Sequence, residues 1–134
     1  MIVVDTSLIA YLLIQGEHSV KARGVLRKDP EWLAPLLWRS ELRNVLALYI
    51  RQGVLSAGEA LQLVREAEAL MKGGEYQVES AEVLSLVVTS KCSAYDCEFV
   101  ALARHLALPL VTTDRQVLAE FPGLAVRPEL FCSG

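Results

Sequence analysis

Short apolar runs alternate with longer amphipathic segments along this chain, and the two kinds of pattern predict different elements. Short apolar runs bounded by turn residues predict strands, whereas apolar positions three and four residues apart predict helices. The expected strands cover residues 2–4, 32–34, 76–78, 110–112 and 124–126. The expected helices cover residues 7–14, 18–27, 36–52, 81–90, 93–105 and 115–120, with a further one from Ser56 to the glycines at 73 and 74.

This alternation of strands and helices is typical of an α/β domain with a largely parallel sheet. Glycine and proline turn signals are spread evenly, and we find no linker, repeat or low-complexity tract. We therefore expect residues 1–134 to form a single domain with one core. Its centre would be a mostly parallel five-stranded sheet sandwiched by helices.

The composition changes this picture in two ways. The chain is 53% hydrophobic with a mean hydropathy of +0.35, so we expect another chain, a copy or a partner, to cover some apolar surface. The formal net charge of −3 argues against a protein that binds nucleic acid through an overall positive field. It does not exclude an enzyme that needs only a local rim of basic residues. No apolar run approaches the ~20 residues that span a bilayer, and no signal peptide opens the chain, so we expect a cytoplasmic protein.

Four acidic residues stand where a carboxylate is costly to bury. Asp5 ends the apolar run 2–4, and Asp114 follows residues 110–113. Glu41 and Asp96 fall within helical patterns, on or beside the apolar stripe. Unpaired charge resists removal from water, and like charges gathered in one site repel each other. A cation that holds the four carboxylates together would offset both costs.

Each acid also has an ordinary structural explanation. Asp5 and Asp114 could each cap the helix that follows. Glu41 could be a partly exposed side chain at the edge of its stripe, and Asp96 could complete a capping box with Ser93. In open parallel sheets, however, sites form at the carboxyl ends of the strands, and two of these acids stand there. Four such coincidences favour a functional site.

The ligand types indicate which ion such a site would hold. Oxygen ligands without histidine or cysteine are typical of Mg²⁺ or Mn²⁺, which activate water and stabilise charge on a phosphoryl group. The hydroxyls of Ser7 and Thr112 could support the cluster. The spacing of the three cysteines, Cys92, Cys97 and Cys132, matches no zinc site, so we expect them to be small, buried, apolar side chains. A disulfide between them is conceivable only if the protein comes from an extreme thermophile.

Four segments, in this order and at these separations, resemble the PIN domain. They are residues 2–7 (IVVDTS), 40–42 (SEL), 95–103 (YDCEFVALA) and 110–114 (LVTTD). The length and the order of motifs resemble the VapC-type toxins of prokaryotic VapBC toxin–antitoxin pairs. The resemblance covers essentially the whole chain.

The resemblance implies a PIN-like fold and a Mg²⁺- or Mn²⁺-dependent endoribonuclease. The matching motifs make Asp5, Glu41, Asp96 and Asp114 the catalytic, metal-binding carboxylates. The implied reaction is in-line attack of a metal-activated water on an RNA phosphodiester. The resemblance also implies a homodimer and inhibition by a cognate VapB-like antitoxin, whose C-terminal segment lies in an apolar groove near the site.

Two positions depart from the family pattern. Gln116 stands where some relatives carry a further acid, so whether the site holds one metal ion or two stays open. Cys97 stands where alanine is common, and we expect this change to affect packing only. Ser7 and Thr112 match polar positions that support the carboxylates in the family.

Basic residues beside the acidic motifs are candidates for contact with RNA phosphates. Arg43 and Arg115 are the two candidates, although ordinary surface charge is the more common role for either arginine taken alone. On their helix, Arg39 and Arg43 are expected to face solvent, and Glu98 is expected to be a solvated surface acid.

Two other functions compete with a nuclease. A receiver-like or phosphatase-like domain would have an adjacent acid pair and a lysine at a late strand end, and the chain has neither. A non-catalytic PIN-fold module that binds RNA or protein is the second alternative, although such modules usually lose acids from the quartet. The identity of the RNA, and the choice between a growth-arresting toxin and a housekeeping nuclease, stay open.

Overall fold

A computed structural model describes all residues from 1 to 134. Its centre is one five-stranded sheet of order β3-β2-β1-β4-β5, in which every pair of neighbours is parallel. The α/β fold with a parallel five-stranded sheet is therefore confirmed. The strands are β1 (Ile2–Val4), β2 (Trp32–Pro35), β3 (Glu75–Tyr76), β4 (Leu110–Val111) and β5 (Ala125–Val126).

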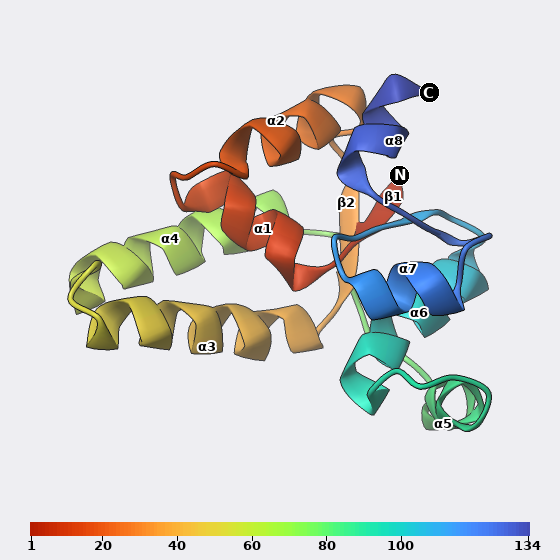
Figure 1. The fold of residues 1–134 in the computed structure, drawn as a ribbon. Helices are drawn as coiled ribbons and strands as arrows, with labels where there is room; N and C mark the ends of the chain where they lie inside the picture. Colours follow the sequence, from red (N-terminus) through yellow and green to blue (C-terminus); the bar gives the residue numbers. More distant parts are fainter.

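Helices flank both sides of the sheet. In Figure 1, α1, α3 and α4 lie on one side, and α5 and α6 lie on the other, where α6 packs against β1, β2 and β4. The long helices α3 and α4 run side by side away from the sheet. The helices are α1 (Thr6–Leu13), α2 (Ser19–Lys28), α3 (Leu37–Arg51), α4 (Ala57–Leu70), α5 (Ser80–Val88), α6 (Ala94–Leu106), α7 (Arg115–Glu120) and α8 (Pro128–Ser133).

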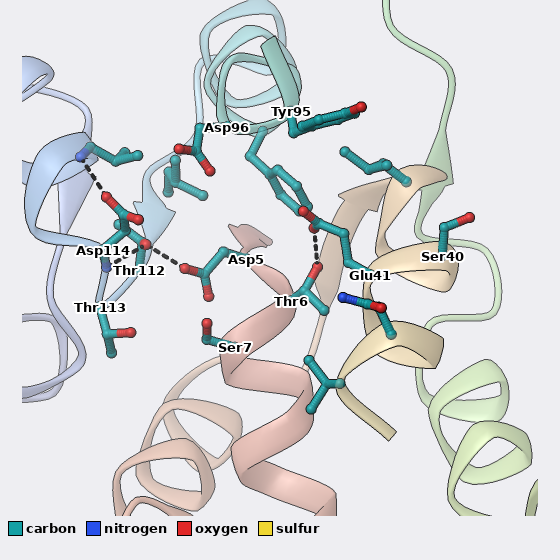
Figure 2. A pocket seen from close by; sticks show the side chains of 16 residues that line it. Asp5, Thr6, Ser7, Ser40, Glu41, Tyr95, Asp96, Thr112, Thr113 and Asp114 are labelled. Atoms are coloured by element: carbon teal, nitrogen blue, oxygen red, sulfur yellow. Dashed lines mark hydrogen bonds between the residues drawn. The ribbon is translucent and has the colours of Figure 1, made fainter. Parts of the chain in front are cut away.

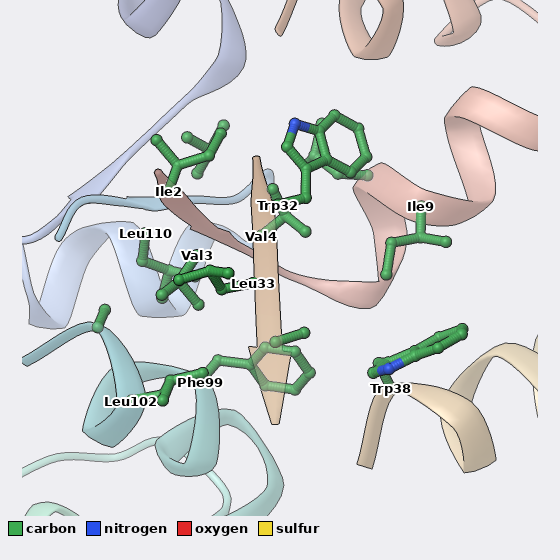
Figure 3. Close-up of a cluster of buried hydrophobic side chains, with 14 of the residues drawn as sticks. Ile2, Val3, Val4, Ile9, Trp32, Leu33, Trp38, Phe99, Leu102 and Leu110 are labelled. Atoms are coloured by element: carbon green, nitrogen blue, oxygen red, sulfur yellow. The ribbon is translucent and has the colours of Figure 1, made fainter. Parts of the chain in front are cut away.

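The strands lie at the centre of the hydrophobic core. Val3 and Val4 are fully buried, as expected for a strand covered on both faces. Trp32, Trp38 and Phe99 are also buried, and Figure 3 shows all three in one cluster of buried hydrophobic side chains around the strands. No helix is long and apolar enough to cross a membrane.

Several predicted boundaries shift in the structure. The third strand is Glu75–Tyr76, two residues long, rather than residues 76–78. Its partner β2 approaches so closely that a Cβ on Gly74 would lie 2.3 Å from the Trp32 carbonyl oxygen, so this position requires glycine. The C-terminal helix Pro128–Ser133 was not predicted, because its apolar stripe is too short to show helical periodicity.

The cysteines follow the expectation only in part. Cys92 and Cys97 are buried, whereas Cys132 is exposed, and all three are free thiols. Cys132 lies in α8, the last helix, which packs mainly against α2. Its position at the end of the chain, outside the main core, accounts for the exposure.

Arg39 was expected to face solvent, but in the structure it is paired with two acidic residues. Its Nε and Nη2 donate to the two carboxylate oxygens of Glu75 at 2.6 and 2.8 Å, and its Nη1 also pairs with Glu68. Trp38 Nε1 donates to the same Glu75 carboxylate at 2.9 Å. The hydrogen bonds from Arg39 hold the pKa of Glu75 below its usual range. The periodicity of α3 could not show this network, because its acids come from α4 and β3.

Candidate active site

A cavity of about 500 Å³ opens at the carboxyl ends of β1 and β4. All four acids singled out in the sequence line it, together with the predicted hydroxyls of Ser7 and Thr112. Figure 2 shows the carboxylates arranged around one central space, with each contributed by a different element. The parallel sheet accounts for the convergence of Asp5 and Asp114, since adjacent parallel strands end at the same edge.

Asp5 is held by polar partners on both carboxylate oxygens. It is the N-cap of α1, where its Oδ1 accepts from the Leu8 backbone N–H at 3.2 Å, and its Oδ2 accepts from the hydroxyl of Thr112. Removal from water raises the pKa of Asp5 to about 6, and the nearby carboxylates add to the rise. The capping explanation and the functional one therefore both apply, because one oxygen caps the helix while the carboxylate lines the cavity.

Asp114 occupies the matching position after β4. It is the N-cap of α7, and its Oδ1 accepts from the Val117 backbone N–H at 2.9 Å. The backbone N–H of Asp114 donates to Thr112 Oγ1 at 3.1 Å. Thr112 is 1% exposed and also donates to Asp5, so its hydroxyl links the Asp5 carboxylate to the backbone of Asp114.

Glu41 reaches the cavity from α3. Its Oε1 accepts a hydrogen bond of 2.6 Å from the hydroxyl of Thr6, a residue that is 7% exposed. Burial raises the pKa of Glu41, and the negative charges of Asp96 and Glu98 raise it further. Glu98 itself is half-buried, and burial raises its pKa, so the expectation of a solvated surface acid was wrong.

Asp96 enters from the first turn of α6. The capping box expected with Ser93 forms only in one direction: Ser93 Oγ accepts from the Asp96 backbone N–H at 3.1 Å, but the Asp96 carboxylate makes no reciprocal bond. The carboxylate is left facing the cavity, as Figure 2 shows. Burial, followed by the charge of Asp114, raises the pKa of Asp96.

The donor set fits a divalent metal ion by its chemistry. It consists of four carboxylates and nearby hydroxyls, the hard oxygen ligands that Mg²⁺ and Mn²⁺ prefer. As the side chains stand, no three acidic, histidine or cysteine groups converge closely enough to hold one ion. Removal from water is the largest cause of the raised pKa values of Asp5, Glu41 and Asp96, and repulsion from neighbouring carboxylates adds to each.

Of the two arginines proposed for RNA contact, only Arg115 lies beside the acidic cavity. Arg115 lies directly after Asp114 and lines a neighbouring cavity that shares Thr113 with the acidic one. Arg43 is exposed on α3 and lines neither cavity, because Ser40 and Asn44 occupy the inward positions of that helix.

Five polar residues that line the cavity were missed in the sequence: Thr6, Ser40, Asn44, Tyr95 and Thr113. The i, i+4 spacing of Ser40 and Asn44, on either side of Glu41, could have placed both beside it. Tyr95 precedes Asp96 and also lines the cavity. Nothing in the local pattern could have shown that Thr6 would bond to a residue in α3.

The PIN domain family model matches residues 2–124. The chain is 34% identical over 128 residues to Ribonuclease VapC3 of Pyrobaculum aerophilum, which covers 92% of this chain and 96% of that protein.

Solved structures share the fold at lower identity. The crystal structure of PAE2754 from Pyrobaculum aerophilum matches with a TM-score of 0.77 and 23% identity, covering 98% of this chain and 92% of that one. A toxin–antitoxin complex from Klebsiella pneumoniae matches with a TM-score of 0.70 and 19% identity, covering 96% and 98%. FitAcB from Neisseria gonorrhoeae matches with a TM-score of 0.76 and 18% identity, covering 96% and 99%.

Proposed function

This chain belongs to the PIN domain family, and we propose that it is a VapC-like endoribonuclease that uses Mg²⁺ or Mn²⁺ to hydrolyse RNA phosphodiesters. The observation that carries the proposal is the convergence of Asp5, Glu41, Asp96 and Asp114 on one cavity at the carboxyl edge of the sheet. A relative that is 34% identical over nearly its whole length is named a ribonuclease, which supports RNA as the substrate.

The four carboxylates would hold the metal ion, with Thr112 and Ser7 beside them. A divalent ion supplies the positive charge that stabilises a phosphoryl group under attack and lowers the pKa of water. The structure supports this role because three of the carboxylates have raised pKa values, so a cation that neutralises them would also favour their ionised form.

The protein side chains position the reacting groups. Thr112 orients Asp5 and fixes the backbone at Asp114, while Thr6 orients Glu41. In the hydrolysis, a water oxygen forms a bond to phosphorus in line with the ester oxygen that leaves. The products are a phosphate monoester and an alcohol, and the proton lost by the water balances the one gained by the leaving oxygen.

We propose two protein partners. The first is a VapB-like antitoxin, supported by the fold shared with a protein from a toxin–antitoxin complex. The second is another copy of the chain in a homodimer. Large apolar side chains on the surface are consistent with both, among them Leu48, Val54, Leu84 and Val88, of which Val88 is 83% exposed.

The first experiment is cleavage of labelled RNA by purified, partner-free protein with Mn²⁺, Mg²⁺ or chelator. Wild type is expected to cut only with metal, and Asp5→Asn and Asp96→Asn are expected to abolish the cutting. Glu31→Gln is the matched control, since it removes one exposed carboxylate next to the amino end of β2, at the opposite edge of the sheet. Cleavage that persists in both active-site variants would reveal a contaminating nuclease and contradict the proposal.

The alternative function is a non-catalytic PIN module. A second measurement, thermal unfolding with Mn²⁺, distinguishes it from a nuclease. Mn²⁺ is expected to raise the thermal unfolding midpoint of wild type and to do so less in Asp5→Asn. A shift in the midpoint without any RNA cleavage would favour the binding module. A neighbouring reading frame for a small DNA-binding protein would favour a toxin over a housekeeping nuclease.

A further inference from the structure

A second cavity, of about 340 Å³, adjoins the acidic one at Thr113, which lines both. Residues from four separate helical regions form its wall, and Figure 1 shows α1, α2, α7 and α8 near one another at this part of the molecule. We call it the basic cavity. Its lining residues are Tyr11, His18, Lys21, Thr113, Arg115, Leu118, Arg127, Pro128 and Glu129.

Positive charge dominates this lining. Lys21, Arg115 and Arg127 each contribute a cation, and Glu129 is the single acid among the lining residues. Lys21 pairs with Glu129 at 2.9 Å, whereas Arg115 and Arg127 are exposed and form no salt bridge. Two arginines are therefore available to a ligand, and arginine is suited to phosphate by its planar donors.

Aromatic side chains form another part of the wall. The rings of Tyr11 and His18 stack with their centroids 4.5 Å apart. The Nδ1 atom of His18 is buried without a hydrogen-bond partner. The cavity thus combines cations with a flat ring pair, the two features that accommodate a single nucleic-acid strand.

The acidic cavity creates the need for such cations. Four carboxylates attract a metal ion, but they repel the phosphates on either side of the one being cut. Screening confines electrostatic attraction to about 8 Å at physiological salt, so only cations next to the cavity can offset that repulsion. The net charge of −3 gives the rest of the protein no overall attraction for RNA.

We propose that the basic cavity binds a backbone phosphate of the same RNA strand whose neighbouring phosphodiester lies over the carboxylates. The proposal rests on the proposed nuclease function and deepens it. It specifies that the substrate is single-stranded RNA, bound on the side of the site formed by α7 and α8. An acidic protein segment is the competing ligand. RNA is favoured because the cavity adjoins, at Thr113, the site where a phosphate would be cut.

The test measures how fluorescein-labelled single-stranded RNA of mixed sequence binds to the full chain in chelator, where no cleavage occurs. The variant is Arg115→Gln with Arg127→Gln, which removes the two lining arginines that form no salt bridge, and the matched control is Arg65→Gln with Lys72→Gln. The control removes the same charge from exposed residues in and after α4, which do not line the basic cavity. Circular dichroism and thermal unfolding verify that both double variants are folded.

Each phosphate that is neutralised contributes about 0.7 to the slope of log affinity against log salt for a single strand, so loss of the one phosphate bound in the basic cavity should lower the slope by about 0.7. The control should keep the wild-type slope. In cleavage assays with Mn²⁺, the cavity variant is expected to raise KM while kcat stays close to wild type.

Equal slopes in the two double variants would overturn the proposal. An equal loss of affinity for a labelled polyglutamate peptide would also overturn it, because the cavity would then attract acidic protein as well as it attracts phosphate. Failure of the nuclease function is seen separately, as absence of metal-dependent cutting by wild type.

Discussion

Thr6 Oγ1 donates a hydrogen bond of 2.6 Å to Glu41 Oε1, and this contact joins the first turn of α1 to the second turn of α3. Thr6 follows Asp5 directly, so one stretch of backbone carries the first carboxylate and orients the second. Thr6 is 7% exposed, which leaves little room for water to replace its hydroxyl. Thr6 is therefore a positioning residue for the proposed metal site.

Replacing Thr6 by valine removes the hydroxyl and keeps the branched shape. Loss of a group that orients a ligand typically costs about 10–100-fold in metal affinity or activity, and we expect that range for Thr6→Val. Thr6→Ser keeps a donor and should stay near wild type. Calorimetric Mn²⁺ titration and RNA cleavage measure the effect. Wild-type Mn²⁺ affinity in Thr6→Val would show that Glu41 needs no orientation from α1.

The raised pKa of Asp5 makes the stability of the metal-free protein depend on pH. Its pKa is about 6 in the folded protein against 3.8 in the unfolded chain, so the folded state binds the proton more tightly. The stabilisation that protonated Asp5 contributes is fully present below pH 3.8, the pKa of the unfolded chain, and is lost as the pH rises through about 6. The acidic cluster therefore destabilises the metal-free fold at neutral pH.

Asp5→Asn should accordingly stabilise the metal-free protein at pH 7, by up to about 3 kcal/mol. Asparagine still caps α1, so the helix is preserved. The gain should vanish near pH 4, where Asp5 of the wild type is largely neutral as well. Urea unfolding at the two pH values in chelator measures it. A variant less stable than wild type at pH 7 would mean that the carboxylate is structural.

The Arg39 network should contribute measurably to stability. Arg39→Met leaves Glu75 without its paired guanidinium, and we expect a loss of about 1–2 kcal/mol at neutral pH, moderated by the partial exposure of Arg39. Because the pairing lowers the pKa of Glu75, its contribution is present above the unfolded value of 4.5 and is lost as pH falls through the folded one. Urea unfolding across this range, with exposed Arg65→Met as control, checks it.

Ala107 offers a stabilising change outside the site. It ends α6 in the left-handed region, with φ 56° and ψ 44°, where a side chain is strained. Ala107→Gly should therefore raise the free energy of unfolding by about 0.5–1 kcal/mol. The same change at exposed Ala69 in α4 should lower it by about 1 kcal/mol. Chemical denaturation of both variants decides whether the strain is real.

The sequence was informative where one local pattern carries the signal. The apolar run Ile2–Val4 predicted a buried strand, and Asp5 at its end predicted a carboxylate at the carboxyl edge of the sheet. The helix expected from Ser56 also forms, and a complete capping box between Ser56 and Glu59 begins it. Each of these features depends on residues a few positions apart, so the printed order of residues is enough to reveal it.

The sequence was silent where distant residues meet. Thr6 and Glu41 are 35 positions apart, and Arg39 and Glu75 are 36 apart. The basic cavity likewise gathers Lys21, Arg115 and Arg127 from three regions of the chain. Helical periodicity shows which face of one helix is apolar, but it holds no information about which polar side chain will be brought opposite that helix.

By itself, then, the sequence determined the parallel α/β architecture and the acids at the strand ends, since burial patterns and strand-end positions are local properties of the chain. Tertiary packing decided which hydroxyl orients each carboxylate, how Arg39 is paired, and where the cations lie relative to the acids. Those relationships depend on the crossing of helices over the sheet, which sets distances between residues that no local spacing specifies.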